Sequence, residues 1–427
     1  MKTLRTSLFA ALGLGALTSV AAANAFNINE HDARVTGRGG ATAASNDDPS
    51  SIVFNVGGMA RGEGTSIRLG SSLYIAEGSY ETDVGTVTTD SDPVVVPNFY
   101  VTSRVHDMLA IGIGTHLPFG LAESWPEGHP QADIVVDETL RTYFITPAVG
   151  LNLDQQVPGL SLGVGVDIVP ATIELENSIF FGDVVGRAHL GADAIGVGFR
   201  AGAMYHPPAV PGLKLGVQYR AKVKLDFDGD GDFDMIEPLR GQLPPDGPVS
   251  ATITLPQSVN GGIAYNWRDL EVEFNVVWID WEQTWENGSL SVNLPGGIVQ
   301  SERQDYENTT TYRFGFDYAF PRYQTAIRGG FIYDPTPIPK ETLTARLPDI
   351  DRKNVTVGIG KKFGDYGVDV GLLWVTPGER NTSTIPNEPQ FKTTYGVEAV
   401  VFSLTASGTF GAPKEPAPVG APAVAKQ

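Results

Sequence analysis

The 427-residue sequence contains no cysteine, and charged residues make up only 19% of it. The absence of cysteine excludes disulfide scaffolds, cysteine-ligated metals and thiol nucleophiles. Basic residues are also few: 30 Lys and Arg stand against 49 Asp and Glu, a net charge of −19. That balance argues against a nucleic-acid partner, because phosphate binding needs a basic surface. Apolar runs long enough for a bundle of membrane helices are missing too.

The N-terminus has the pattern of a secretory signal peptide. Two basic residues precede an apolar run over residues 8–20, and small residues follow up to Ala25. This order of basic start, short apolar middle and small-residue cleavage site predicts removal of residues 1–25. Cleavage after Ala25 would leave Phe26 as the first residue, and cleavage after Ala23 also fits the pattern. We therefore expect an exported protein.

Downstream segments alternate between apolar and polar residues with a period of two. The clearest covers residues 213–227, where odd positions are apolar and even positions are mostly charged, polar or glycine. Residues 270–278 and 366–374 repeat the pattern. Strands this long are unusual in soluble proteins but are what a membrane barrel needs, since lipid cannot satisfy a free sheet edge. Tight connections alternate with long polar ones, as in outer-membrane barrels.

These features predict an all-β fold, a transmembrane antiparallel β-barrel of about 14 strands over residues 65–410. Residues 26–64 lack strand alternation and are too few to fold alone, so we expect an N-terminal hatch (plug) inside the lumen. Residues 411–427 are rich in Pro and Ala and are expected to form a disordered tail. The expected location is the bacterial outer membrane, and the expected state is a monomer.

Several segments, taken in this order on a predicted barrel, resemble the FadL-type family of outer-membrane transporters (OMPP1/FadL/TodX) for long-chain fatty acids and other hydrophobic compounds. The resemblance covers nearly the whole chain after the signal peptide except the tail. It is carried by Phe26–Glu30, Gly37–Gly39, Asp47–Asp48, Asn55, Pro118–Leu121, Tyr219–Phe227, Asp280–Trp281, Tyr333–Pro339 and Pro348–Arg352.

The resemblance implies passive transport of a hydrophobic small molecule. By this resemblance we expect outer loops to capture the ligand, a lumen pocket gated by the hatch to hold it, and the ligand to leave sideways through the barrel wall into the lipid. The resemblance also implies that no cofactor is required and that the protein is not an enzyme. Phe26 matches the aromatic residue in the pocket. The hatch turn corresponds to Asn55, Val56 and Gly57, and the lateral exit to Pro118, Phe119 and Gly120.

Two departures from the family pattern affect the expected ligand. Val56 and Gly57 replace the Pro and Ala of the family's hatch turn, so the turn is expected to form differently. Leu117 and Asn177 align with the serine and arginine that face the bound carboxylate in the fatty-acid transporter. Without that cation a buried carboxylate needs another partner. The sequence thus favours a hydrophobic ligand over a fatty acid in particular.

Two polar groups are further candidates for binding sites. Arg220, Lys222 and Lys224 are expected to face the lumen, where they would neutralise a ligand headgroup or pair with the acids of residues 271 and 273. The following segment satisfies the spacing of an EF-hand calcium loop, with either calcium or solvent on its carboxylates. The possible calcium ligands are Asp226, Asp228, Asp230, Asp232 and Glu237.

Two other functions remain open. An outer-membrane enzyme acting on lipids would need clustered catalytic side chains, but the six histidines show no paired metal spacing and no G-x-S-x-G motif is present. A structural or adhesive barrel would use the calcium loop to bind surfaces. Neither explains a plug-like N-terminus. Trp267, Trp278, Trp281, Tyr366 and Trp374 near strand ends are expected to form interfacial aromatic girdles.

Overall fold

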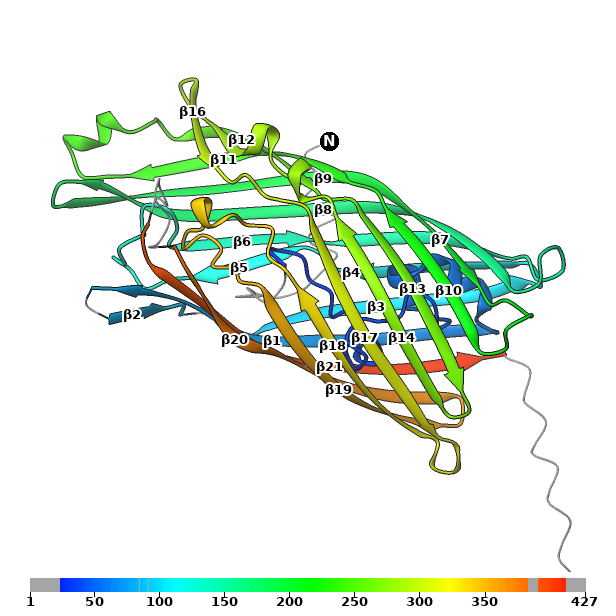
Figure 1. Cartoon of the computed structure of the whole chain (residues 1–427). Coiled ribbons are helices and arrows are strands. Elements are labelled where there is room, and N and C mark those ends of the chain that lie inside the picture. Colours follow the sequence, from blue (N-terminus) through cyan, green and yellow to red (C-terminus); the bar gives the residue numbers. More distant parts are fainter. Residues whose placement is uncertain (1–23, 84, 91, 383–390, 412–427) are drawn as a thin grey trace, which may run out of the picture.

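The computed structural model describes residues 24–83, 85–90, 92–382 and 391–411. The expected signal peptide up to residue 23 and the expected tail after residue 411 lie outside these residues. The described residues form 21 strand segments that close into one antiparallel barrel (Figure 1). In the described part of the chain, none of the helices has the length and apolar character needed to cross a membrane.

Fourteen of the strand segments make the closed ring, in which each pairs with the next and the last pairs with the first. The expected fold class and strand number are therefore confirmed. The ring strands are β1 (Thr65–Thr82), β3 (Val94–His106), β4 (Leu109–His116), β7 (Phe144–Asn152), β8 (Leu160–Phe181), β9 (Val184–Tyr205), β10 (Leu213–Arg220), β13 (Ser258–Trp267), β14 (Leu270–Ile279), β17 (Thr309–Phe320), β18 (Thr325–Asp334), β19 (Arg352–Phe363), β20 (Tyr366–Asn381) and β21 (Thr394–Phe410).

The other seven segments lengthen the wall at the end opposite the tight turns (Figure 1). They are β2 (Gly85–Thr88), β5 (Gly120–Ser124), β6 (Asp137–Thr142), β11 (Val223–Asp234), β12 (Gly247–Leu255), β15 (Ser289–Leu294) and β16 (Ile298–Arg303). Short 3₁₀ helices also occur in the connections: η2 (Leu239–Gln242), η3 (Trp281–Gln283), η4 (Glu286–Gly288), η5 (Pro321–Tyr323) and η6 (Lys340–Thr342). We call the end with the long connections the outer end, because outer-membrane barrels carry their long loops outside.

The alternation read from the sequence separates the two faces of the wall. On β9, Val197 is 66% exposed and its neighbours two residues away are exposed too, whereas Gly196, Gly198 and Arg200 face the interior. On β14, Phe274, Val276 and Trp278 point outward, while Glu273, Asn275 and Val277 are buried. Because apolar residues cover the outside and polar ones the inside, the barrel suits a lipid environment.

One strand differs from the expectation. Residues 213–227 form two segments rather than one, β10 and β11, separated by Ala221 and Lys222. Leu215 and Val217 point outward on β10, but Val223 and Leu225 are fully buried on β11. The register of pairing with β9 shifts by one residue between the two segments, so this chain segment carries one extra residue. Side chains at odd positions, which point outward on β10, therefore point inward on β11. The outer segment therefore turns its apolar side into the barrel.

The N-terminal segment, residues 24–64, lies inside the barrel. It contains the short helices α2 (Ala33–Gly37), α3 (Ser51–Phe54) and η1 (Val56–Arg61), which contact strands around much of the wall (Figure 1). Asp32 caps α2 by accepting hydrogen bonds from the amides of Arg34 and Val35. Nearly all of the segment is buried. We call residues 26–64 the hatch segment below.

Candidate functional site

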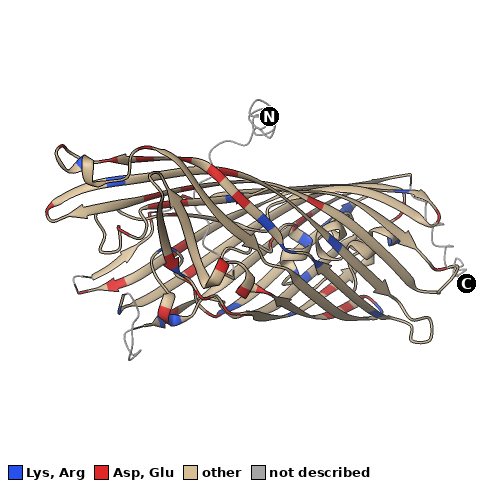
Figure 2. Cartoon of the chain, turned by 90° about the horizontal axis from the view of Figure 1, so that it is seen from above, with Lys and Arg blue, Asp and Glu red and all other residues tan. Residues whose placement is uncertain are grey.

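Buried ion pairs fix the body of the hatch segment to the wall. The Arg68 guanidinium on β1 contacts both carboxylate oxygens of Asp32, at 2.7 and 2.8 Å, and also Asp369 at 3.0 Å. On another side Arg38 lies 2.8 Å from Glu271. Losing one partner of such a buried pair costs about 3–5 kcal/mol, so these contacts hold the hatch body firmly. Figure 2 shows that acidic and basic segments are interspersed along the barrel.

The hatch turn predicted at Asn55, Val56 and Gly57 lies against β8, β9 and β10. The Asn55 side-chain amide donates to the carbonyl of Ala203 at 3.0 Å, and its oxygen accepts from the amide of Gly57. A Cβ atom on Gly163 of β8 would come within 2.2 Å of the Val56 carbonyl oxygen. Glycine in the wall therefore permits this close approach, and the turn forms without the family's proline.

The first described residues are held by two aspartates, which lie in the segments Tyr333–Pro339 and Pro348–Arg352. The Asn24 side chain donates to Asp334 at 2.9 Å, and the amide of Ala25 donates to Asp349 at 3.0 Å. Asp349 also accepts from Thr336 and from Arg352. Burial raises the pKa of the Asp349 carboxyl above its usual range, while Arg352 opposes this shift.

Residues 26–28 then form a short stretch of β-structure with the interrupted strand β4–β5. Asn27 makes an isolated antiparallel bridge with Phe119. The amide of Ile28 donates to the Pro118 carbonyl at 2.8 Å, and the amide of Gly120 donates to the Phe26 carbonyl at 2.9 Å. The structure therefore joins the predicted pocket residue and the predicted exit residues directly, although they lie about ninety positions apart in the sequence.

The wall is interrupted at the same place. The ladder between β3 and β4 ends at the pair Phe99 and Thr115, and β5 pairs with β6 instead. Residues 94–98 of β3 keep their partners on β1, but in the described part of the chain no ladder joins them to β5. Residues 117–119 separate β4 from β5 and turn to the hatch segment. This break in the ladder is where the lateral exit was expected.

Phe26 belongs to a cluster of buried aromatic side chains inside the barrel, whose rings pack against one another. Its ring centre lies 5.1 Å from that of Trp281, 5.9 Å from Phe119 and 6.3 Å from Trp285. Tyr306 closes the group from the side of both tryptophans. Phe26 is only 4% exposed. We call these five residues the aromatic chamber.

Trp281 was expected in an interfacial girdle, and this was wrong. It is fully buried in the aromatic chamber, because the chain leaves β14 at Ile279 and turns inward through η3. Trp285 and Tyr306 were not singled out from the sequence. All three lie in long outer connections, where strand alternation gives no facing direction. Trp267, Trp278, Tyr366 and Trp374 are exposed on the outside, as a girdle requires.

A second buried apolar cluster contains Ile28. Ile28 packs there with buried residues of β1, β3, β20 and β21, and Leu117 belongs to the same cluster. Phe26 and Ile28 therefore belong to two different buried apolar clusters, of which the second includes residues of β3 beside the interrupted ladder.

The basic group splits between two faces. Arg220 ends β10 and points into the lumen, where its guanidinium carbon lies 4.6 Å from the centre of the Phe119 ring. Lys222 and Lys224 are exposed, and they bond Gln283 and Asp226 respectively. The expectation that all three face the lumen was wrong for the lysines, because the face exchange at Ala221 reverses the direction of the side chains that follow.

The proposed calcium loop is also not a loop. Asp226, Asp228, Asp230 and Asp232 lie at alternate positions of β11, and Glu237 lies beyond its end. Side chains two apart on a strand are separated by about 6.6 Å, so they do not converge on one ion with ligand distances of about 2.4 Å. Among the described residues, no group of three or more acidic or histidine side chains is arranged to hold a metal.

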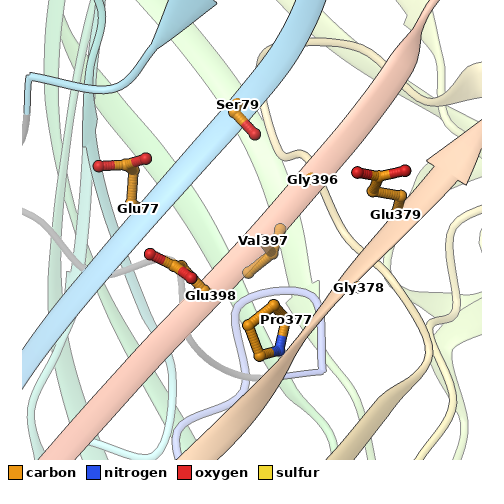
Figure 3. A pocket seen from close by; sticks show the side chains of 8 residues that line it. All are labelled: Glu77, Ser79, Pro377, Gly378, Glu379, Gly396, Val397 and Glu398. Carbon is orange, nitrogen blue, oxygen red and sulfur yellow. The ribbon is translucent and has the colours of Figure 1, made fainter.

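Two surface pockets have linings that include none of the five residues of the aromatic chamber. One of about 490 Å³ is lined by Glu77, Glu379 and Glu398 together with Ser79, Pro377, Gly378, Gly396 and Val397 (Figure 3). Glu77 and Glu398 are direct partners across β1 and β21 and are exposed on the outside of the wall. An acidic outer-wall pocket does not suit a hydrophobic ligand, so we base the site on the chamber.

The chain matches the family model described as outer membrane protein transport protein (OMPP1/FadL/TodX) over residues 14–410. It is 23% identical over 414 residues to a long-chain fatty acid transport protein of Salmonella typhi, covering 88% of this chain and 92% of that one. It is 25% identical to outer membrane protein P1 of Haemophilus influenzae over 316 residues, 66% and 65% of the two chains.

Solved structures show the same fold. The crystal structure of a Pseudomonas aeruginosa FadL homologue superposes with a TM-score of 0.80 at 20% identity, covering 90% of this chain and all of that one. The Pseudomonas putida toluene transporter TodX superposes with a TM-score of 0.70 at 17% identity, covering 90% and 99%. With a family match that spans most of its length, this chain belongs to the OMPP1/FadL/TodX family of outer-membrane transport proteins.

Proposed function

We propose that this outer-membrane protein takes up hydrophobic small molecules and releases them sideways into the membrane. The observation that carries the proposal is the bridge between Asn27 and Phe119, which ties the N-terminal residues to the interrupted strand beside the aromatic chamber. Similar proteins are named for long-chain fatty acids or for toluene, which supports a hydrophobic ligand of either kind. An enzyme acting on lipids is not supported, because the family consists of transport proteins.

The proposed route has three stages. The outer connections capture the ligand, and the aromatic chamber buries it against Phe26. Residues 24–28 then detach from Phe119 and open the way to the second apolar cluster and the interrupted ladder. The hatch body, residues 31–61, stays in place because buried ion pairs anchor it, so we assign the gate to its first residues. The ladder break beside Pro118–Gly120 is the proposed lateral exit.

Partition drives this route without a cofactor. Each buried methylene group contributes about 0.8 kcal/mol, so an alkyl or aryl body leaves water for the chamber spontaneously. Leaving the chamber for the lipid exchanges one apolar environment for another and costs little. The ring of strands closes within one chain, so we propose that the monomer acts alone, with outer-membrane lipid as the acceptor.

The test is uptake by cells that lack their own transporter of this family and express this chain. We expect faster accumulation of at least one of hexadecanoate, hexadecane and toluene than in cells carrying an empty vector. Deletion of Asn24–Ile28 should change the rate while the barrel still assembles, as judged by its heat-modifiable migration on gels. Equal accumulation of all three compounds with and without the protein would refute the assignment.

A further inference from the structure

Arg220 is a cation in the lumen without an anionic partner. In the described part of the chain, no carboxylate lies within 4.0 Å of its guanidinium, and its buried Nε has no hydrogen-bond acceptor. The guanidinium lies over the face of Phe119, one ring away from Phe26. A cation–π contact contributes about 0.5–2 kcal/mol and does not use the five N–H donors of the group.

Most other arginines inside the barrel are paired. Carboxylates contact each of Arg34, Arg38, Arg68, Arg200, Arg328, Arg346 and Arg352. Arg313 has no ion pair among the described residues either, but it is 4% exposed and covered by Gly40 of the hatch segment. Arg220 keeps a larger exposed fraction than Arg313 and adjoins the aromatic chamber.

The acidic group that interacts electrostatically with Arg220, Asp167, already has other partners. Asp167 lies 2.8 Å from the Arg200 guanidinium and accepts a hydrogen bond of 2.6 Å from Thr146. His116 and His31 lie in the same region, and burial lowers the pKa of His31 to about 3, so that ring is neutral. Arg220 therefore stands beside other cations and neutral rings, which makes an incoming anion favourable.

We propose that Arg220 is the headgroup site of the transporter and that the preferred ligand is an amphiphile with a single carboxylate. This inference rests on the proposed function. The planar guanidinium donates two parallel hydrogen bonds to a carboxylate, and one unpaired cation balances one negative charge. The hydrophobic body of the ligand then lies among Phe26, Trp281 and Trp285.

This assignment resolves the departure noted in the sequence. The position aligned with the family's carboxylate-facing arginine is Asn177, whose side chain lies in the outer extension of β8 and bonds backbone carbonyls. The cation is instead Arg220 at the end of β10, immediately before the register shift that reverses the facing direction of the side chains. Lys222 and Lys224 are exposed on the other face, so Arg220 alone of these three basic residues reaches the lumen.

The test uses the purified full-length protein in detergent and follows the fluorescence of its tryptophans. Trp281 and Trp285 line the site, so a ligand in the chamber should change their emission. The probes are hexadecanoate, hexadecanol and hexadecane, which share one body. We expect the wild type to bind hexadecanoate about 10- to 100-fold more tightly than hexadecanol, as for a charge-assisted hydrogen bond.

Three variants localise the effect. Arg220→Met should lose the preference for the carboxylate and keep binding of hexadecane, and Arg220→Lys should retain part of the preference. Lys222→Gln, which changes the exposed neighbouring cation, should behave as the wild type. Equal binding of hexadecanoate and hexadecanol by the wild type would overturn the inference even if every variant failed to fold. Failure of all three probes to bind would instead count against the proposed function itself.

Discussion

The proposed gate predicts that a covalent bond between the N-terminal residues and the interrupted strand will stop transport. Asn27 and Phe119 form a non-hydrogen-bonded antiparallel pair, because the two bonds of the bridge run between their neighbours. Such pairs have Cα atoms about 4.5 Å apart, within the range that a disulfide spans. Since the natural chain has no cysteine, Asn27→Cys with Phe119→Cys creates only the intended disulfide.

The magnitude follows from the two backbone hydrogen bonds that the disulfide would reinforce. At about 0.5–1.5 kcal/mol each they contribute about 1–3 kcal/mol, so the bridge alone would be open in on the order of one molecule in ten to one in a hundred. A disulfide removes this open population. We therefore expect the oxidised double variant to transport at less than about a tenth of the rate of its reduced form.

The assay is uptake of labelled hexadecanoate by cells carrying the double variant, before and after treatment with a membrane-permeable reductant. Each single variant serves as a control for the lost side chain, and its rate should not depend on the reductant. Formation of the disulfide is checked by a gel shift after alkylation. If the oxidised and reduced double variants transport at the same rate, detachment of residues 24–28 is not part of the mechanism.

Three further outcomes follow from the structure. Gly163→Val should place a side chain where the Val56 carbonyl lies, displace the hatch and raise the permeability of cells to small hydrophilic antibiotics; Gly261→Val, with open space around it, should not. The mass of the mature protein should show Asn24 as its first residue, since its side chain binds Asp334; a mass starting at Phe26 would contradict this. Chelation of calcium with EDTA should leave uptake by the purified protein in vesicles unchanged. A loss of uptake would instead support calcium binding by the acidic residues of β11.

The architecture of the wall was predictable because a period of two is a strong local signal. The first strand begins at Thr65 as expected, and the outward residues of β14 are those that the alternation indicated. The same reasoning failed at residues 213–227, where the residues remain alternating but the chain gains one residue relative to β9. Periodicity reports that neighbouring side chains point to opposite faces, and it does not report which face is inside.

The site was predictable only in part. The resemblance pointed to Phe26 and to Pro118–Gly120, and the structure places them in one short piece of sheet. Trp281, Trp285 and Tyr306 lie in irregular connections, so their inward direction depends on tertiary packing that no local pattern encodes. The lack of an ion-pair partner for Arg220 could likewise not be predicted from the sequence, because it depends on which partner each acidic side chain of the lumen contacts.

The length of the hairpin β8–β9 determines how far above the bilayer the apolar lining of the barrel begins. Each strand has 22 residues, which at about 3.3 Å per residue makes about 70 Å of chain and, tilted by about 45°, a height of about 50 Å. The apolar belt of such barrels is only about 25 Å tall, so roughly half of the hairpin stands in the hydrated layer beyond the bilayer. There the change of facing direction on β11 puts polar side chains on the outside of the barrel and apolar side chains on the inside. A hydrophobic molecule therefore meets an apolar surface inside the barrel well before it reaches the lipid.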